Sequence, residues 1–406
     1  MSKSRKVIAI LVLALTYAAS FTPVYMKYVL YEPLLDAFNI TNAQAGYLMA
    51  AYTIFNTILY IPGGFIADKY SIKKILSISL IGQSILCFWL SFSTNYTTAL
   101  VVWLFFGITT GFALWSGLLK AVLSLGSSED SSMVAGIYGL MGALFTIGMN
   151  VLFLQVYNAI GVPQSGMSTI FRICGIIAIS ASILVWIFYK DGEKVESEEK
   201  FELAHLKPLL KNPVVWTISL VILTSYALRV GGNTYFSPFL LDCYAVDSST
   251  VSMLGILRSN VFPMLMPVAG FVASKVFKST TKLLRISFVA IGVMFAILTF
   301  CSQSLPTWLA IVFSLLPGLL SGMSFGISFA VISESSLPQK VMGTAIGIVS
   351  MIVYLPDFVF DPVFGTLIDV FGNVGYTYIF GVLAIFSIVG IVSSTKLINS
   401  KDVRAE

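Results

Sequence analysis

The segment GFIADKYSIKK, residues 64–74, is a short charged turn between two long apolar runs. Gly64 stands at its start, and Asp68 and Lys69 follow within the same turn. Lys73 and Lys74 then precede the next apolar run. Each neighbouring run is long enough to cross a bilayer, which takes about 20 residues of helix. The segment therefore predicts a basic cytoplasmic turn that joins two membrane-spanning helices.

The composition of the whole chain agrees with a membrane location. Of its 406 residues, 57% are hydrophobic and only 11% are charged. Soluble domains carry about 25% charged residues, so this chain belongs with polytopic membrane proteins. The formal net charge of +5 raises the question of a nucleic-acid partner. However, most of the lysines and arginines lie in the loops, so the lipid bilayer is the expected partner and nucleic acid is not.

Apolar runs of spanning length recur along the chain. Twelve of them occupy residues 7–30, 45–67, 75–92, 98–123, 133–157, 170–188, 213–241, 251–272, 283–301, 308–333, 343–370 and 376–397. Several exceed the minimum length, which predicts tilted helices and no additional spans. The sequence thus predicts an all-α membrane protein with twelve transmembrane helices.

The positive charges fall on alternate loops. They are Lys3, Arg5, Lys6, Lys69, Lys73, Lys74, Lys275, Lys278, Lys282, Lys340, Lys396, Lys401 and Arg404, with further lysines in the polar segment 190–211. Short loops rich in Lys and Arg stay in the cytoplasm. We therefore expect a multi-pass protein of the plasma or inner membrane with both termini in the cytoplasm, and we interpret the basic N-terminus as leading into an uncleaved first span.

An internal repeat divides the chain into halves. EPLLD at residues 32–36 returns as SPFLLD at 237–242, and GFIADK at 64–69 returns as GFVASK at 270–275. The two shifts, 205 and 206 residues, agree, although Ser274 replaces the acid in the second copy. We predict an N-terminal bundle at residues 1–189, a solvated linker at 190–211 and a C-terminal bundle at 212–406.

The charged turn also carries a family resemblance. Gly64, Asp68, Lys69, Lys73 and Lys74 have the spacing of the loop 2-3 signature of the major facilitator superfamily (MFS), which the chain resembles. A serine, at position 71, stands where that family usually has a second glycine. The resemblance implies two pseudo-symmetric six-helix bundles with a cavity between them that opens alternately to either side. It also implies that the turn acts as a gate.

The basic residues within or near the apolar runs include Lys27, Lys120, Arg172, Arg229 and Arg258. A charge at bilayer depth costs about 2.5 to 3.5 kcal/mol on insertion scales, so each of them needs a partner or an aqueous cavity. Arg172 is close to an interface and can extend toward it. Two roles are open for Lys120. It either pairs with Asp68 in the inner gate or contacts the substrate.

Lys27 and Arg229 lie on the first and seventh spans, which the repeat relates. We therefore predict that these two cations, together with Arg258, bind an anionic substrate. The resemblance supports this, because the family branch that carries organic phosphates has a basic residue on each of these two helices. Arg can bind a carboxylate, phosphate or sulfonate with two parallel hydrogen bonds, whereas Lys offers a mobile point charge.

Polar and aromatic residues accompany both cations at helical spacing. Tyr31 follows Lys27 by four residues, while Tyr226 and Asn233 lie three and four residues from Arg229. Their hydroxyl and amide groups can bind substrate hydroxyls. Alternatively, the tyrosines pack at the membrane interface.

The eleventh run contributes two acids. Asp357 and Asp361 are four residues apart on one helical face, and Pro356 and Pro362 loosen the helix around them. Either one acid takes up a proton and couples transport to the proton gradient, or both form fixed salt bridges with the arginines. Three cations against two acids leave a net charge of only +1, so a zwitterionic or neutral substrate remains open.

Two further stretches narrow the resemblance. They are Trp115 to Lys120 with Leu125, Gly126 and Glu129, and GTAIG at residues 343–347 leading to Pro356 and Asp357. Both resemble a branch of the superfamily associated with sulfosugars and other organic anions. This branch implies a small organic anion as substrate.

No catalytic, cofactor or metal site is predicted. The four cysteines are widely spaced, and the only histidine, His205, lies in the polar linker. We expect a monomeric secondary transporter, not an enzyme, that moves a small organic anion by alternating access and is driven by protons, sodium or counter-substrate. The alternatives are a carrier of a neutral or zwitterionic solute such as a sugar, a transporter-like membrane receptor, and a lipid translocase.

Overall fold

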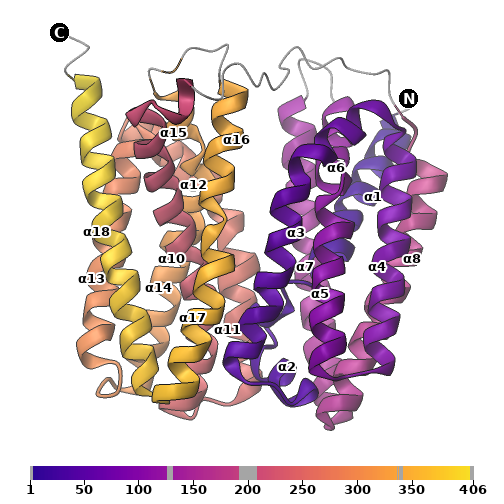
Figure 1. Ribbon diagram of the computed structural model, residues 1–406, viewed down its shortest axis with the longest axis horizontal. Helices are drawn as coiled ribbons and strands as arrows, with labels where there is room; N and C mark the ends of the chain where they lie inside the picture. Colours follow the sequence, from indigo (N-terminus) through magenta and orange to yellow (C-terminus); the bar gives the residue numbers. More distant parts are fainter. Residues whose placement is uncertain (1–2, 126–130, 192–207, 336, 338–341, 403–406) are drawn as a thin grey trace. The chain divides into compact units, whose positions relative to one another are not determined.

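A computed structural model describes residues 3–125, 131–191, 208–335, 337 and 342–402 (Figure 1). Its regular elements within these ranges are all helical, as the apolar runs predict. Ten helical segments of the described chain are long and apolar enough to cross a membrane. The remaining two predicted runs form α1 (Lys3–Phe21) and α3 (Asn42–Lys69), which are not among those ten. The count of twelve spans therefore stays a prediction.

The chain separates into two compact units, Met1–Glu196 and Ser197–Glu406. Most of the predicted linker, residues 192–207, lies outside the described residues. Each unit is a bundle of helices with its own buried core. The predicted boundaries at residues 189 and 212 stay predictions.

The first unit begins with α1. It continues with η1 (Met26–Tyr28), α2 (Tyr31–Phe38), α3, α4 (Ile72–Phe92), α5 (Tyr96–Gly111), α6 (Leu114–Leu125), α7 (Ser131–Ile160) and α8 (Pro163–Phe188). Helix α4 packs along α8, and α3 packs along α5. Close approach of α3 and α5 requires glycine, because a Cβ on Gly107 would collide with the carbonyl oxygen of Tyr52.

The second unit begins with α10 (Pro213–Tyr244). It continues with α11 (Ser248–Ile256), η2 (Leu257–Val261), η3 (Phe262–Leu265), α12 (Met266–Phe271), η4 (Val272–Val276), α13 (Thr280–Cys301), α14 (Thr307–Ser328), α15 (Ala330–Ser333), α16 (Met342–Val353), α17 (Leu355–Phe371) and α18 (Val374–Asp402). Helix α13 packs along α18, and α10 packs against both α18 and α14. The core is rich in aromatic side chains such as Phe236, Phe288 and Phe380.

Several predicted runs are interrupted helices. The first run breaks after Phe21, because Pro23 has no N–H to donate and its ring clashes with the preceding turn. The fourth run breaks between α5 and α6, where Ala113 has a left-handed φ of 70°. The eighth contains two π-helical turns, η2 and η4, and such turns are frequent at functional sites. By contrast, α10 is continuous although Pro238 lies inside it.

Candidate functional site

Lys27 lies in the interrupted part of the first run, on the short helix η1. Its side chain is only 3% exposed, and its Nζ lies 5.5 Å from the centre of the Tyr28 ring. Tyr28 stacks on Tyr25 at a centroid distance of 5.5 Å, and Tyr25 meets Tyr52 edge to face. Ring faces attract cations, so this aromatic surrounding offsets part of the cost of burying the ammonium group. Lys27 is thus a buried cation, as predicted from the sequence.

Lys27 and Tyr31 do not lie on one continuous helix. Helix α1 ends at Phe21, and Tyr31 begins the separate helix α2. The Tyr31 hydroxyl donates a hydrogen bond of 2.9 Å to Oδ1 of Asn42, the first residue of α3. The predicted spacing assumed one helix, and Pro23 is the physical reason that it does not hold.

Arg229, Tyr226 and Asp357 come together in the second unit. The Tyr226 hydroxyl donates a hydrogen bond of 2.5 Å to Oδ2 of Asp357, joining α10 to α17. The Tyr226 ring lies 4.9 Å from both Phe325 and Tyr354, and the Arg229 guanidinium lies 5.3 Å from the Phe325 ring. A half-buried arginine, a buried carboxylate and three aromatic rings therefore form one cluster.

Two members of this cluster, Phe325 and Tyr354, were not predicted as site residues. Their only signal in the sequence is an aromatic side chain within an apolar run, which packing residues share. Asn233, which was predicted, is 2% exposed, and its Oδ1 accepts no hydrogen bond from the described residues. Asp361 is fully buried, and its backbone carbonyl accepts a hydrogen bond of 2.9 Å from the Tyr235 hydroxyl.

Arg258 lies on the π-helical turn η2 and is completely buried. Its Nη2 donates to Oγ of Ser237 at 2.6 Å, and its Nη1 donates to Oγ of Ser314 at 3.3 Å. Its Nε has no hydrogen-bond partner among the described residues. Gly318 makes room for the side chain, since a Cβ there would lie 3.1 Å from Cγ and Cδ of Arg258. Serine hydroxyls thus hold this arginine, and its Nε keeps one unused donor.

The charged turn is anchored by Asp191, which was not predicted as a partner of the turn. Ser71 caps α4 by accepting a hydrogen bond from the Lys74 N–H, and its own hydroxyl donates to Oδ2 of Asp191 at 2.5 Å. Asp191 also accepts a hydrogen bond of 2.9 Å from the Lys73 N–H. The serine that replaces the family's second glycine therefore connects the turn to the segment after α8.

The predictions for the gate fall partly outside the described structure. Only the helical backbone of Gly64 and Asp68 is described, and residues 126–130, which include Glu129, lie outside the described residues. Lys69 ends α3, and the Nζ of Lys73 lies 4.8 Å from the Trp186 ring. Lys120, on α6, is half-buried. Because the side chain of Asp68 is not described, the pairing of Lys120 with Asp68 stays a prediction.

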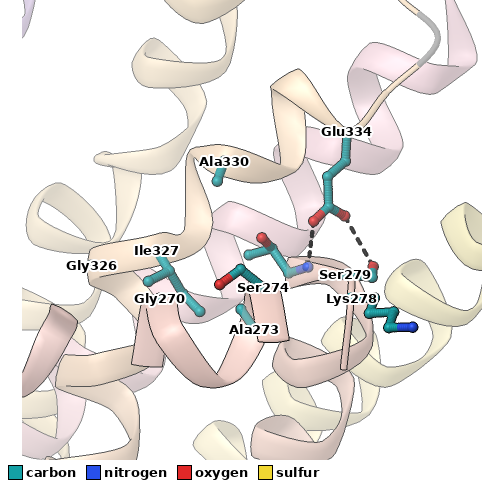
Figure 2. A pocket seen from close by; sticks show the side chains of 10 residues that line it. Gly270, Ala273, Ser274, Lys278, Ser279, Gly326, Ile327, Ala330 and Glu334 are labelled. Atoms are coloured by element: carbon teal, nitrogen blue, oxygen red, sulfur yellow. Dashed lines mark hydrogen bonds between the residues drawn. The ribbon is translucent and has the colours of Figure 1, made fainter. Parts of the chain in front are cut away.

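The second copy of the turn is anchored by Glu334. Its carboxylate accepts hydrogen bonds from the Ser279 hydroxyl and from the N–H of Thr280, at the start of α13 (Figure 2). It also accepts hydrogen bonds from the N–H and the hydroxyl of Thr281. A cavity of about 630 Å³ lies beside it, lined among others by Gly270, Ser274 and Gly326. None of the predicted substrate-binding residues lines this cavity, so we do not assign it to the substrate.

Glu334→Gln is expected to destabilise the protein by about 1 to 3 kcal/mol, because an ionised acceptor of several hydrogen bonds is replaced by a neutral one. Burial raises the pKa of Glu334, but the bonds from Thr280 and Thr281 lower it more, to about 2 from an ordinary 4.5. Because the folded pKa is the lower one, this stabilisation is complete above pH 4.5 and is lost as the pH falls toward 2. Thermal melts of both proteins check this, and equal melting temperatures at pH 7 would contradict it.

Comparison with known proteins places these features in a family context. Residues 11–360 match the model of the Major Facilitator Superfamily. The chain is 29% identical over 375 residues to the inner membrane protein YqcE of Escherichia coli, with 89% of this chain and 87% of that protein covered. It is 26% identical to the inner membrane protein YihN of the same organism, covering 92% and 90%. The probable nitrate transporter NarT of Staphylococcus epidermidis is 25% identical, covering 93% and 94%.

Solved structures share the fold. A bacterial homologue of the human lysosomal transporter Spinster, in an inward-facing unoccupied conformation, has a TM-score of 0.77 at 17% identity, covering 98% of this chain and 99% of that one. The nucleoside transporter NupG has a TM-score of 0.73 at 16% identity, covering 97% and 98%. At these identities the likeness concerns the fold alone.

Proposed function

The chain belongs to the Major Facilitator Superfamily of membrane transporters, and from this premise we propose that it is a secondary carrier of a small organic anion. The observation that carries the proposal is the presence of basic side chains inside the bundles of both halves. Lys27 is buried in the first unit and Arg258 in the second, where Arg229 is half-buried. A cation at bilayer depth is costly, and binding of a negatively charged substrate is a function that accounts for basic residues at that depth.

In this proposal Lys27 and Arg229 bind the anionic head group as the carrier alternates between its outward-open and inward-open states. Arg229 provides oriented, bidentate hydrogen bonds, and Lys27 provides a mobile charge. Tyr226 and Asn233 supply polar groups for the rest of the substrate. The relative named as a probable nitrate transporter adds support for an anion, although nitrate is not organic.

Asp357 has two alternative roles in this proposal. In either role, the hydrogen bond from Tyr226 orients its carboxylate. Asp357 takes up the coupled proton, or it stays ionised as a fixed partner of the arginines, in which case sodium or a counter-substrate drives transport. The carrier works as a monomer with both termini in the cytoplasm. Its bundles correspond to residues 1–189 and 212–406.

A neutral or zwitterionic substrate is the second candidate. It is favoured by one observation, the burial of both Asp357 and Asp361 in the same unit as Arg229 and Arg258. Two carboxylates can balance two arginines and leave little net charge for an anion. A thermal-shift screen with carboxylates, phosphates, sulfonates and uncharged sugars separates the candidates. Stabilisation by an anion alone supports the proposal, whereas stabilisation by an uncharged sugar alone would replace it.

The two copies of the charged turn should differ in importance. We expect Asp68→Asn to impair transport at least about tenfold, since it removes the acid of the gate and a charged interaction of about 1.5 to 3 kcal/mol. Ser274→Ala is the matched change in the second copy, where the hydroxyl donates to the carbonyl of Phe271 in the same helical turn. This variant should transport normally. Initial uptake rates in proteoliposomes measure both, and equal impairment would remove the asymmetry.

A further inference from the structure

The end of helix α1 leaves backbone carbonyls that need hydrogen-bond donors. The last carbonyls of any helix lack a partner within the helix, and inside a membrane protein each must be satisfied locally. Here the N–H of Thr22 bonds to the Ala18 carbonyl at 3.0 Å, and the N–H of Tyr25 bonds to the Phe21 carbonyl at 3.1 Å. The Ser20 carbonyl lies between the Ala18 and Phe21 carbonyls in the chain and accepts neither of these two bonds.

Gln83 supplies the donor for that carbonyl. Its Nε2 lies 2.9 Å from the Ser20 carbonyl oxygen, and the Gln83 side chain is only 1% exposed. The other end of the amide is also used, because the Thr109 hydroxyl donates to Oε1 at 2.8 Å. The amide therefore connects three helices: α4, which carries Gln83; α5, which carries Thr109; and the end of α1.

From this geometry we infer that Gln83 is a positioning residue for Lys27. The bond fixes where α1 stops, and the chain from Phe21 leads directly through the Tyr25 N–H bond into η1, which holds Lys27. Without the amide, the Ser20 carbonyl would have to find its donor by rearranging the turn that carries Lys27. The inference rests on the proposed function only in that Lys27 binds the anion.

The second half offers an internal comparison. Helices α4 and α13 both begin after an N-cap serine, Ser71 and Ser279, and this shift of 208 residues carries Gln83 onto Ile291, a fully buried apolar residue of α13. Helix α10, which matches the first span in the repeat, is continuous from Pro213 to Tyr244 and has no carbonyls to cap at that level. The buried amide accompanies the interrupted helix, and an apolar residue takes its position where the helix is whole.

Gln83→Met tests the inference, because methionine fills a similar volume and has no N–H to donate. Ser84→Ala is the matched control: the Ser84 hydroxyl on the same helix donates to the Gly175 carbonyl of α8 at 2.8 Å, away from the α1 break. Thr109→Val is a milder variant that keeps the Gln83 amide and removes the hydroxyl that orients it, together with that hydroxyl's bond of 3.1 Å to the Phe106 carbonyl in its own helix. Hydrogen exchange of peptides covering residues 19–28 should speed up at least about tenfold in Gln83→Met, less in Thr109→Val, and remain unchanged in Ser84→Ala.

The second readout is affinity for an anion. Glucuronate, glucose 6-phosphate, ethanesulfonate and nitrate are titrated into the purified proteins, and the tightest binder serves as probe. Gln83→Met should weaken its binding about tenfold, whereas Ser84→Ala stays within about twofold, because a lost buried bond of about 1.4 kcal/mol equals that factor. Lys27→Ala shows whether the probe depends on Lys27.

The outcomes separate the two claims. Equal exchange at residues 19–28 in Gln83→Met and Ser84→Ala would overturn the positioning role. So would unchanged anion affinity in Gln83→Met when Lys27→Ala lowers it. If exchange rises as expected but no anion depends on Lys27, Gln83 still positions this segment, and it is the proposed function that fails.

Discussion

Arg229→Ala is expected to reduce uptake of the transported anion at least about 30-fold, and Lys27→Ala to do the same. Truncating one partner of a buried, hydrogen-bonded charge pair costs about 2 to 5 kcal/mol, and 1.4 kcal/mol is a factor of ten in affinity. Arg229→Lys should recover part of the activity, since it restores the charge and lacks the bidentate geometry. Initial rates of uptake into proteoliposomes measure the effect.

Arg172→Ala is the matched control for these variants. Arg172 is also a basic residue of a predicted span, but it is exposed on α8 and its guanidinium lies 5.8 Å from the Phe92 ring. Its removal should leave uptake unchanged. If Lys27→Ala and Arg229→Ala are folded in detergent and transport at the wild-type rate, these two cations do not bind the substrate.

If Asp357 takes up the coupled proton, Asp357→Asn abolishes accumulation driven by a pH gradient while exchange of substrate across the membrane persists. Asparagine keeps an oxygen that accepts the hydrogen bond from Tyr226, so the local geometry is retained. It cannot take up or release a proton, so coupling is lost. Accumulation and counterflow are measured in the same proteoliposomes with and without a pH gradient.

Two variants identify which group is responsible. Asp361→Asn tests the second buried acid, whose backbone carbonyl accepts the bond from Tyr235 and keeps it after the change. Tyr226→Phe removes the donor to Asp357 and keeps the ring that packs on Phe325. If both asparagine variants still accumulate substrate against the pH gradient, the acids are fixed charge partners and another ion or a counter-substrate drives transport.

The sequence could predict which side chains are buried, because few charges occur in the apolar runs. Lys27, Arg258, Asp357 and Asp361 are all 3% exposed or less. The helical fold and the family followed from the apolar runs and the charged turn. Burial, helical structure and family membership each depend on residue types and spacings that can be seen along the sequence.

The contacts between distant residues could not be predicted in the same way. Tyr226 and Asp357 are 131 positions apart, and Ser71 and Asp191 are 120 apart. Periodicity reports which face of a helix is apolar, but it does not report which helices pack together. The break after Phe21 was also missed, because proline is tolerated within membrane helices when neighbouring groups satisfy the freed carbonyls. Pro23 interrupts its helix and Pro238 does not.

The most direct test of the proposal that Lys27 and Arg229 bind the substrate anion is calorimetric titration of the purified carrier with the anion that stabilises it most. Wild-type protein and the Arg172→Ala control should bind with the same affinity, and Lys27→Ala and Arg229→Ala should each bind at least about tenfold more weakly. Wild-type affinity in both of these variants would contradict the central claim that Lys27 and Arg229 hold the substrate.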